Sequence, residues 1–288
     1  MNYIFKIINY FLQSIFIYIF FFIGRILGIV VSRYLFAFIF SLIGPIFKSK
    51  KILNDNLNIF SRNLSSEDRK EIVNCMWKNY GKTFIEYIFL SHFQKSKSHV
   101  SIEGEENLKE IYQNTKPVIF VSGHFANFEL MSMEITKRKI ALATIYRPLN
   151  NPFLNPFMEY LRKKYVCSNQ IKKGIKGVRE TIEYLKKKYC IALMIDQRVS
   201  EGEKINLFGK PALTTTLPAQ LSFKFNLDII PIYIERDNKN KFNIRFQERI
   251  NPKKFKDKLE LTEELNKVLE KMIKKNPTQW IWTHNRWK

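Results

Sequence analysis

The chain has 288 residues, and its 48 lysines and arginines against 26 aspartates and glutamates give a formal net charge of +22. It is 45% hydrophobic, which excludes a disordered basic tail because apolar side chains are numerous enough to offset the entropy of an ordered chain. Three widely spaced cysteines, Cys75, Cys167 and Cys190, exclude a disulfide framework and a CxxC zinc site. The positive charge fits either a lysine-rich surface without function or attraction to nucleic acid, anionic lipid or an acidic carrier.

The first fifty residues contain no acidic side chain. Residues 7–24 are uncharged and near the minimum length that spans a bilayer as a helix. A cleaved signal peptide is disfavoured by the weakly charged start and the lack of an A-x-A site. A second apolar run, 34–47, is short for a span and is expected to be buried or interfacial. We predict a single-pass anchor in residues 1–50 and, by the positive-inside rule, an α/β domain in 51–288 on the cytoplasmic side.

Amphipathic helices alternate with short β-rich segments from residue 65 onward. Ser65 and Asp68 resemble a capping box at the start of a helix that continues to Ile88. Strands are predicted at 117–122, 140–146, 189–195, 229–234 and 242–248. Further helices are predicted at 127–137, 156–164, 177–188, 216–225 and 261–275. Near-continuous apolar strands between helices predict an α/β fold with a mixed, largely buried sheet flanked by helices.

The segment with the most chemical information is residues 118–130, VIFVSGHFANFEL. The predicted strand ends just before His124, and Glu129 follows five positions later. An imidazole beside a carboxylate suits a general base, because the carboxylate fixes the tautomer and stabilises the imidazolium. The chain has no G-x-S-x-G elbow, so we expect direct activation of a substrate hydroxyl rather than an acyl-enzyme. On spacing alone, a chance H-x-x-x-x-E is the commoner explanation.

The context of this motif resembles the lysophospholipid acyltransferase superfamily, in its lipid A (late, Kdo-dependent) acyltransferase branch, which has H-x-x-x-x-E where glycerolipid acyltransferases have H-x-x-x-x-D. Further blocks resemble that branch in the same order along the chain: Tyr146-Arg147-Pro148, Lys173-Gly174, residues 192–198 (ALMIDQR), residues 207–212 (LFGKPA) and residues 279–287. The usual motif has Gly and Trp at the positions of Ala126 and Phe128. The extra methyl group of Ala126 is expected to narrow the site and to leave the dyad of His124 and Glu129 intact.

This resemblance implies a glycerolipid-acyltransferase-like fold behind a membrane helix at the bacterial inner membrane. It also implies transfer of an acyl chain from acyl-acyl carrier protein to a hydroxyl of an anionic lipid A precursor in lipopolysaccharide biosynthesis, without a metal or cofactor. His124 would be the general base and Glu129 would hold its imidazole. The candidate substrate-binding residues are Asn127, Arg147, Arg179, Asp196, Arg198 and Lys210.

Most of these candidates also have a structural interpretation. Arg147 fits a clamp for an acceptor phosphate, since guanidinium groups bind phosphate bidentately, or a surface arginine after a strand. Asp196 and Arg198 end a buried strand, where α/β folds place their sites, but an aspartate capping the next turn fits equally well. Lys210 contacts an anionic substrate or merely forms a turn. Asn127 orders the dyad loop or caps the following helix.

Other hypotheses stay open at this stage. Trp280, Trp282 and Trp287 lie near cations, which fits a membrane interface or a core-packed terminal strand. Nucleic-acid binding is disfavoured, because the Gly174–Gly177 loop resembles a KH loop without the rest of that module. A second enzymatic hypothesis is acylation of another glycolipid or aminolipid. A hypothesis of another class is a non-catalytic, membrane-anchored polyanion-binding protein, for which the dyad would be dispensable.

Overall fold

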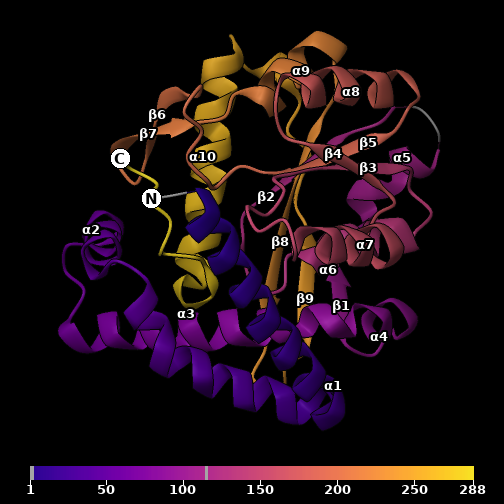
Figure 1. The fold of residues 1–288 in the computed structure, drawn as a ribbon. Helices are drawn as coiled ribbons and strands as arrows, with labels where there is room; N and C mark the ends of the chain where they lie inside the picture. The colour runs from indigo at the N-terminus through magenta and orange to yellow at the C-terminus, as the bar shows by residue number, and fades with distance from the viewer. Residues whose placement is uncertain (1–2, 114–115) are drawn as a thin grey trace.

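A mixed seven-stranded sheet forms the centre of the computed structural model, which describes residues 3–113 and 116–288 (Figure 1). The strand order is β1-β9-β8-β2-β5-β3-β4, and every neighbouring pair is parallel except β8 and β9. The strands of this sheet are β1 (Val100–Glu103), β2 (Ile119–Ser122), β3 (Leu142–Tyr146), β4 (Asn169–Lys172), β5 (Cys190–Met194), β8 (Ile229–Arg236) and β9 (Phe242–Phe246). A separate antiparallel hairpin consists of β6 (Glu203–Leu207) and β7 (Lys210–Thr214).

Helices cover both sides of this sheet. In Figure 1, β2 and β8 lie between α10 on one side and α6 and α7 on the other. The helices are α1 (Tyr3–Phe47), α2 (Lys50–Phe60), α3 (Ser66–Glu86), α4 (Leu90–Lys95), α5 (Lys109–Tyr112), α6 (Glu129–Lys137), α7 (Asn155–Tyr165), α8 (Ile175–Lys186), α9 (Leu217–Phe225) and α10 (Lys258–Lys275). The predicted fold class is therefore confirmed. Each predicted strand and helix overlaps an observed one, whereas β1, β4, β6 and β7 were not predicted.

Local sequence explains the best-predicted elements. The Ser65 hydroxyl accepts a hydrogen bond from the Asp68 backbone N–H at 3.0 Å, and the Asp68 carboxylate accepts one from the Ser65 backbone, so the capping box is confirmed. All four residues of β2 are buried, as expected of a strand between parallel neighbours. Each large apolar side chain buried there stabilises the fold by roughly 1.5–3 kcal/mol.

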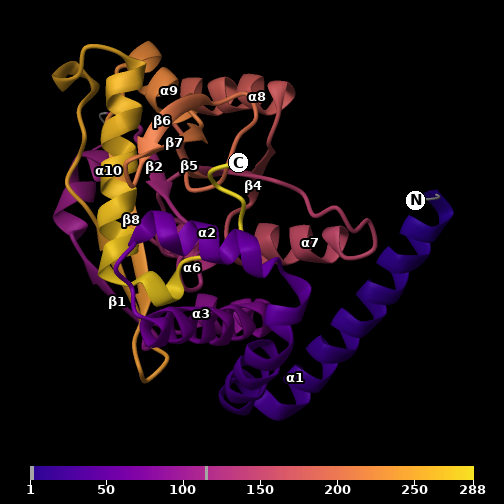
Figure 2. The same ribbon diagram turned by 90° about the vertical axis from the view of Figure 1, so that its left-hand side faces the viewer.

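Helix α1 bends back on itself at Gly28, whose φ is 73° and ψ is 167°. A positive φ is accessible to glycine because it has no Cβ. Across the bend, the Ser32 hydroxyl donates to the Gly24 carbonyl at 2.8 Å, and the rings of Phe20 and Phe36 lie 5.5 Å apart. Figure 2 shows the arm before the bend projecting from the domain toward the N-terminus. The two apolar runs of the sequence therefore form one kinked helix.

The arm after the bend packs on α3. A Cβ added at Gly44 would meet the Trp77 ring at 2.3 Å, and one at Gly81 would meet the Phe36 carbonyl at 2.2 Å, so small residues permit this close packing. The outward face of this arm exposes Tyr34, Phe38, Leu42 and Ile46. The predicted buried or interfacial segment thus has one buried and one exposed side.

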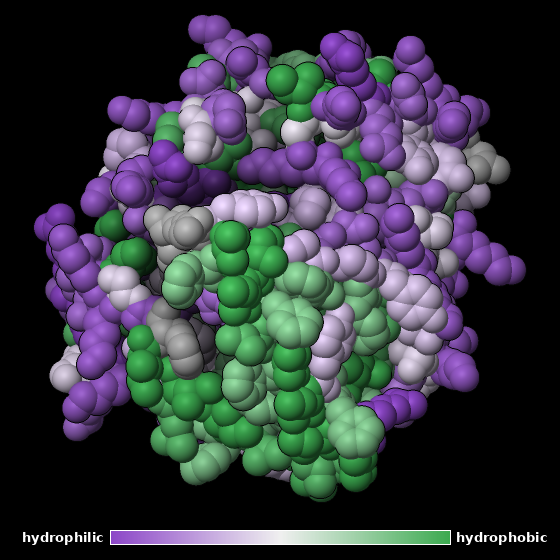
Figure 3. Space-filling model, viewed as in Figure 1, coloured by the Kyte–Doolittle hydropathy of each residue, from purple (hydrophilic) through white to green (hydrophobic). Residues whose placement is uncertain are grey.

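Apolar side chains gather on one face of the molecule, over α1 (Figure 3). The arm before the bend exposes, among others, Ile4, Phe5, Ile8, Phe16, Ile19, Phe22 and Ile26. Within the described part of the chain, α1 is the one helix with the length and composition to cross a membrane. Exposed apolar area of this extent is unusual for a protein surface that faces water.

Two of the three C-terminal tryptophans belong to the core, and the third, Trp287, is half-buried against it. Trp280 and Trp282 are 2% and 0% exposed, and the centroids of their rings lie 4.6 Å apart. Of the two interpretations of this tryptophan-rich end, core packing is therefore correct for both residues.

Candidate active site

His124 and Asp196 meet at the carboxyl edge of the sheet. They follow the adjacent parallel strands β2 and β5, in which Ser122 is paired with Met194. Each residue lies two positions beyond that pair, so the register itself places the two side chains opposite one another. The His124 Nδ1 and an Asp196 carboxylate oxygen are 2.8 Å apart.

Both carboxylate oxygens of Asp196 accept hydrogen bonds. Its second oxygen accepts hydrogen bonds from the His124 backbone N–H at 2.8 Å and from the Trp280 indole N–H at 2.9 Å. Burial alone would raise the pKa of the Asp196 carboxyl, but His124 and Trp280 outweigh it and lower this pKa to about 2. The carboxylate therefore stays ionised and accepts from Nδ1–H, which leaves Nε2 as the basic nitrogen of the imidazole.

The contact between His124 and Asp196 also shifts the pKa of the imidazole. Burial on its own would lower the pKa of His124, but the charge of Asp196 and its hydrogen bond raise it above the ordinary value, with a smaller contribution from Glu129. His124 is thus a stronger base than a free histidine. A raised pKa of this kind is typical of a group that accepts a proton during a reaction.

Glu129 has different partners from those expected. It is the first residue of α6, and one of its carboxylate oxygens accepts hydrogen bonds from the Tyr87 hydroxyl at 2.6 Å and from Arg162 at 2.7 Å. Arg162 also donates to the Tyr87 hydroxyl at 2.9 Å. The expectation that Glu129 holds the imidazole is therefore corrected, because the carboxylate bonded to His124 is Asp196.

The loop between His124 and Glu129 contains a strained residue. Ala126 has a φ of 41°, in the left-handed region that favours glycine. Its carbonyl accepts a hydrogen bond from the Thr83 hydroxyl at 2.9 Å, and its N–H donates to the Gln279 carbonyl at 3.2 Å. Ala126 is 4% exposed and is not among the residues that line the cavity beside His124. The extra methyl group therefore strains the backbone and does not narrow the site as expected.

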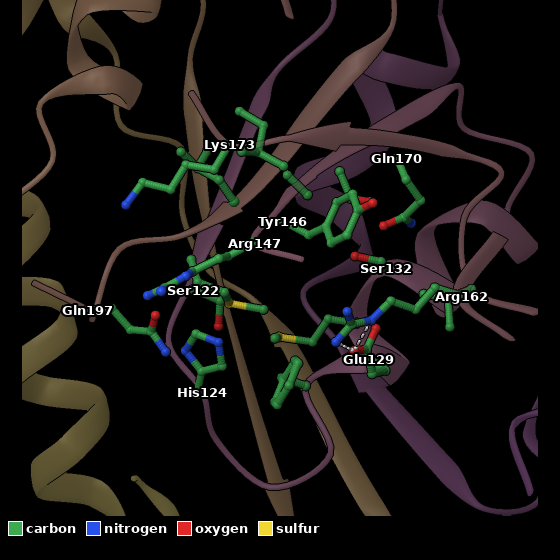
Figure 4. A pocket seen from close by; sticks show the side chains of 18 of the residues that line it. Ser122, His124, Glu129, Ser132, Tyr146, Arg147, Arg162, Gln170, Lys173 and Gln197 are labelled. Carbon is green, nitrogen blue, oxygen red and sulfur yellow. Dashed lines mark hydrogen bonds and ion pairs between the residues drawn. The ribbon is translucent and has the colours of Figure 1, made fainter. Parts of the chain in front are cut away.

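A cavity of about 690 Å³ opens beside His124 and Glu129 (Figure 4). Its walls are largely apolar and include Phe21 of α1, Phe84 of α3 and Met158 of α7. Figure 4 shows Glu129 facing Arg162 on one side of the cavity, with His124 on the other side. A cavity of this size with a few polar groups among apolar walls is typical of a site for an organic ligand.

Three of the eight predicted site residues line this cavity: His124, Glu129 and Arg147. Two more, Asp196 and Asn127, lie behind it, at 3% and 1% exposure. The remaining three, Arg179, Arg198 and Lys210, are not brought to the cavity. Arg179 is exposed on α8, Lys210 is exposed at the start of β7, and Arg198 donates to the Lys288 carbonyl through its Nε.

Sequence reasoning missed several polar residues of the site. Arg162 and Tyr87 hold Glu129, and Lys173, Gln197 and His284 line the cavity. Lys173, Gln197 and His284 lie inside the sequence blocks quoted above, which was a usable signal. Arg162 and Tyr87 lie on helices with no motif around them. Among the described residues, no cluster of three or more His, Cys, Asp or Glu side chains has the arrangement of a metal site.

The chain is similar to known proteins over most of its length. The sequence profile described as "Bacterial lipid A biosynthesis acyltransferase" matches residues 3–288. The Lipid A biosynthesis lauroyltransferase of Escherichia coli K12 is 24% identical over 246 residues, 83% of this chain and 78% of that protein. The palmitoleoyltransferase of the same pathway and strain is 24% identical over 252 residues, 84% of this chain and 79% of that protein. A solved 1-acyl-sn-glycerophosphate acyltransferase from Thermotoga maritima aligns with 88% of this chain and 100% of its own, at 17% identity and a TM-score of 0.41.

Proposed function

Because the chain belongs to the bacterial lipid A biosynthesis acyltransferase family, we propose that it transfers a fatty acyl chain from acyl-acyl carrier protein to a hydroxyl of an anionic lipid A precursor. Acyl transfer in lipid A biosynthesis is the activity for which its relatives are named. The single observation that supports a catalytic role for this site is the His124–Asp196 pair beside a mostly apolar cavity.

The reaction that we propose is a direct transfer. His124 Nε2 takes the proton of the acceptor hydroxyl while that oxygen attacks the thioester carbonyl of the donor. The bond to sulfur then breaks, and the imidazolium returns the proton to the thiolate of the carrier. Asp196 accepts from Nδ1–H throughout, so it fixes the tautomer and stabilises the imidazolium.

We assign Glu129 an electrostatic role in this reaction. Its carboxylate faces the cavity, where Tyr87 and Arg162 fix its position, and its charge favours the protonated form of His124. This differs from direct support of the imidazole, but Glu129 is still essential for the reaction alongside His124. A fixed negative charge near a developing imidazolium stabilises the transition state without any reorganisation.

Two exposed cations at the cavity supply charge complementary to the proposed acceptor. Arg147 and Lys173 both line the cavity, and Figure 4 shows both on the side away from Arg162. A guanidinium and an ammonium attract a phosphorylated lipid, and the guanidinium fork matches phosphate geometry. We therefore keep Arg147 as a proposed phosphate contact and add Lys173. The oxygen that becomes negative during transfer needs donors of its own, and the Gln197 amide, which lies beside His124 in Figure 4, is a candidate.

The exposed face of α1 supports a membrane location. Its apolar side chains would be buried in lipid, and Phe21 of the same helix lines the cavity, so the site adjoins the membrane-facing surface. We propose that α1 anchors the protein to the bacterial inner membrane and that the sheet domain lies on the cytoplasmic side, where acyl carrier protein is available. The division at residue 50 remains a prediction, and the arm after Gly28 packs on α3 of the sheet domain.

An assay with purified components tests this proposal. Full-length protein in mixed micelles is incubated with a phosphorylated lipid A precursor and acyl-acyl carrier protein, and product is measured by mass spectrometry. We expect turnover by the wild-type protein and a loss of about 100- to 10,000-fold for His124→Ala. A folded His124→Ala variant that retains a tenth of wild-type turnover would contradict the role of His124. Acyl-coenzyme A as a comparison donor shows whether the carrier protein is required.

A further inference from the structure

A buried charge cluster lies directly beneath the loop that carries His124. Its centre is Glu86, the last residue of α3, which is 0% exposed. One carboxylate oxygen accepts from Arg33 Nε of α1 at 2.6 Å and also from Arg236 at the end of β8. The other accepts from Arg236 and from the side-chain amide of Asn127, both at 2.9 Å. Three segments far apart in the sequence thus converge on one carboxylate.

The loop above this cluster needs external support. Ala126 holds a left-handed conformation that is unfavourable for a non-glycine residue, so the neighbouring contacts must impose it. Those contacts are the Thr83 hydroxyl and the Gln279 carbonyl on Ala126, and the Glu86 carboxylate on Asn127. Thr83 and Glu86 both belong to the last turn of α3. The end of this helix therefore holds two consecutive residues of the catalytic loop.

We propose that Glu86 is a positioning residue for acyl transfer, which sets the His124–Glu129 loop through Asn127; this inference rests on the function proposed above. Glu86 is fully buried and is not among the residues that line the cavity, so it acts only through the loop. The two arginines pull its carboxylate into one orientation, with one oxygen directed at the Asn127 amide. A bond between a charged acceptor and a fixed amide is stronger than a neutral one, which suits it to hold a strained turn.

The competing explanation is that Glu86 only neutralises two buried arginines. Glu86→Asp separates the two roles, because it keeps the negative charge but shortens the side chain by one methylene, about 1.5 Å. The arginine side chains are long and adapt to a retracted carboxylate. The Asn127 amide is fixed by the backbone of the loop and loses its acceptor. Neutralisation predicts an unchanged kcat for the folded variant, whereas positioning predicts a lower one.

The experiment measures kcat and KM of full-length Glu86→Asp with acyl-acyl carrier protein and the lipid A precursor. Misplacement of a catalytic group by about 1 Å costs up to roughly 100-fold, so we expect kcat to fall 10- to 100-fold with both KM values within about twofold. Glu134→Asp is the matched control: Glu134 is also buried and paired with two cations, but these are Lys137 and Arg138, three and four positions along its own chain segment, whereas Glu86 is bonded to the 124–129 loop. Its kcat should equal that of the wild type.

Asn127→Ala, alone and combined with Glu86→Asp, tests the same hydrogen bond from its other side. If Glu86→Asp does not fold, Asn127→Ala removes the other partner and should lower kcat by the same factor. If both single variants fold, the double variant should lose no more than either one, because both remove the same interaction. A folded Glu86→Asp with a kcat within about twofold of wild type, or fully additive effects, overturns the proposal.

A substrate-free readout separates this inference from the function on which it rests. Amide hydrogen exchange of residues 124–129 should be about 10- to 100-fold faster in Glu86→Asp than in Glu134→Asp, because a hydrogen bond to a charged group no longer closes the loop. Equal exchange in the two variants overturns the positioning role. A wild-type protein that shows no turnover with this donor and acceptor refutes the proposed function, and the exchange result still decides the role of Glu86.

Discussion

Replacing Asp196 by asparagine should convert His124 to the wrong tautomer. The carboxylate oxygen that accepts from both the His124 backbone and the Trp280 indole cannot be replaced by an amide NH₂ without two donor–donor contacts. The amide oxygen of asparagine must therefore take that position, which turns its NH₂ toward Nδ1. Nδ1 then becomes an acceptor and Nε2 carries the proton, so the imidazole cannot take one from the substrate.

The expected loss is large. When an amide replaces the carboxylate that orients the histidine of a Ser-His-Asp triad, kcat falls about 10,000-fold through the same change of tautomer. We expect a loss of similar order for Asp196→Asn, at nearly unchanged substrate KM. Glu129→Gln should lower turnover without this change of tautomer, because Glu129 does not bond to the imidazole.

The pH dependence gives an independent check with a defined sign. His124 acts as a base when neutral, so activity is lost as the pH falls through its pKa, which Asp196 raises above the usual value of about 6.5. Without that charge, burial alone lowers the pKa. The acidic limb of kcat/KM should therefore lie above pH 6.5 in the wild type and shift to lower pH in Asp196→Asn. Retention of more than a tenth of wild-type kcat, or an acidic limb that does not move, would refute this reasoning.

Variants at three other places test separate parts of the structure. Ala126→Val should lower both the melting temperature and kcat, because a β-branched residue fits the left-handed conformation poorly. Ala126→Gly should keep both near the wild-type values. Thermal unfolding and steady-state kinetics check these two expectations. Arg162→Ala should destabilise the fold by about 3–5 kcal/mol in denaturant titrations, since it leaves the Glu129 carboxylate without its cation, and Arg162→Ala/Glu129→Ala should recover part of that loss. The double variant Phe16→Lys/Phe22→Lys should release the protein from lipid vesicles in flotation assays, because each exposed ring contributes roughly 1.5–3 kcal/mol when buried in lipid. An unchanged bound fraction would argue against α1 as the anchor.

The order of the strands in the sheet could not be predicted from the sequence. The apolar runs that became β2 and β5 were predicted, and both His124 and Asp196 were candidates because each follows a strand. Their contact depends on β5 pairing with β2 in one register, although the two residues are 72 positions apart in the chain. A spacing rule finds only near neighbours, so it paired His124 with Glu129.

Local patterns were reliable where local forces decide the structure. The capping box at Ser65 was confirmed, since its bonds join residues three positions apart. The bend at Gly28 was missed, because two uncharged runs separated by Arg25 and Arg33 fit two segments as well as one kinked helix. Residues chosen only by sequence block, such as Lys210, lie away from the cavity, since a block records similarity and not position in space.

The composition of lipid A itself tests the proposed function most directly. Lipid A is extracted from cells that lack the gene and from the same cells complemented with the wild-type, His124→Ala or Asp196→Asn protein, and its acyl chains are counted by mass spectrometry. We predict that cells without the gene lose one secondary acyl chain, that the wild type restores it, and that neither variant does. An unchanged lipid A profile without the gene, or full restoration by His124→Ala, would contradict the account.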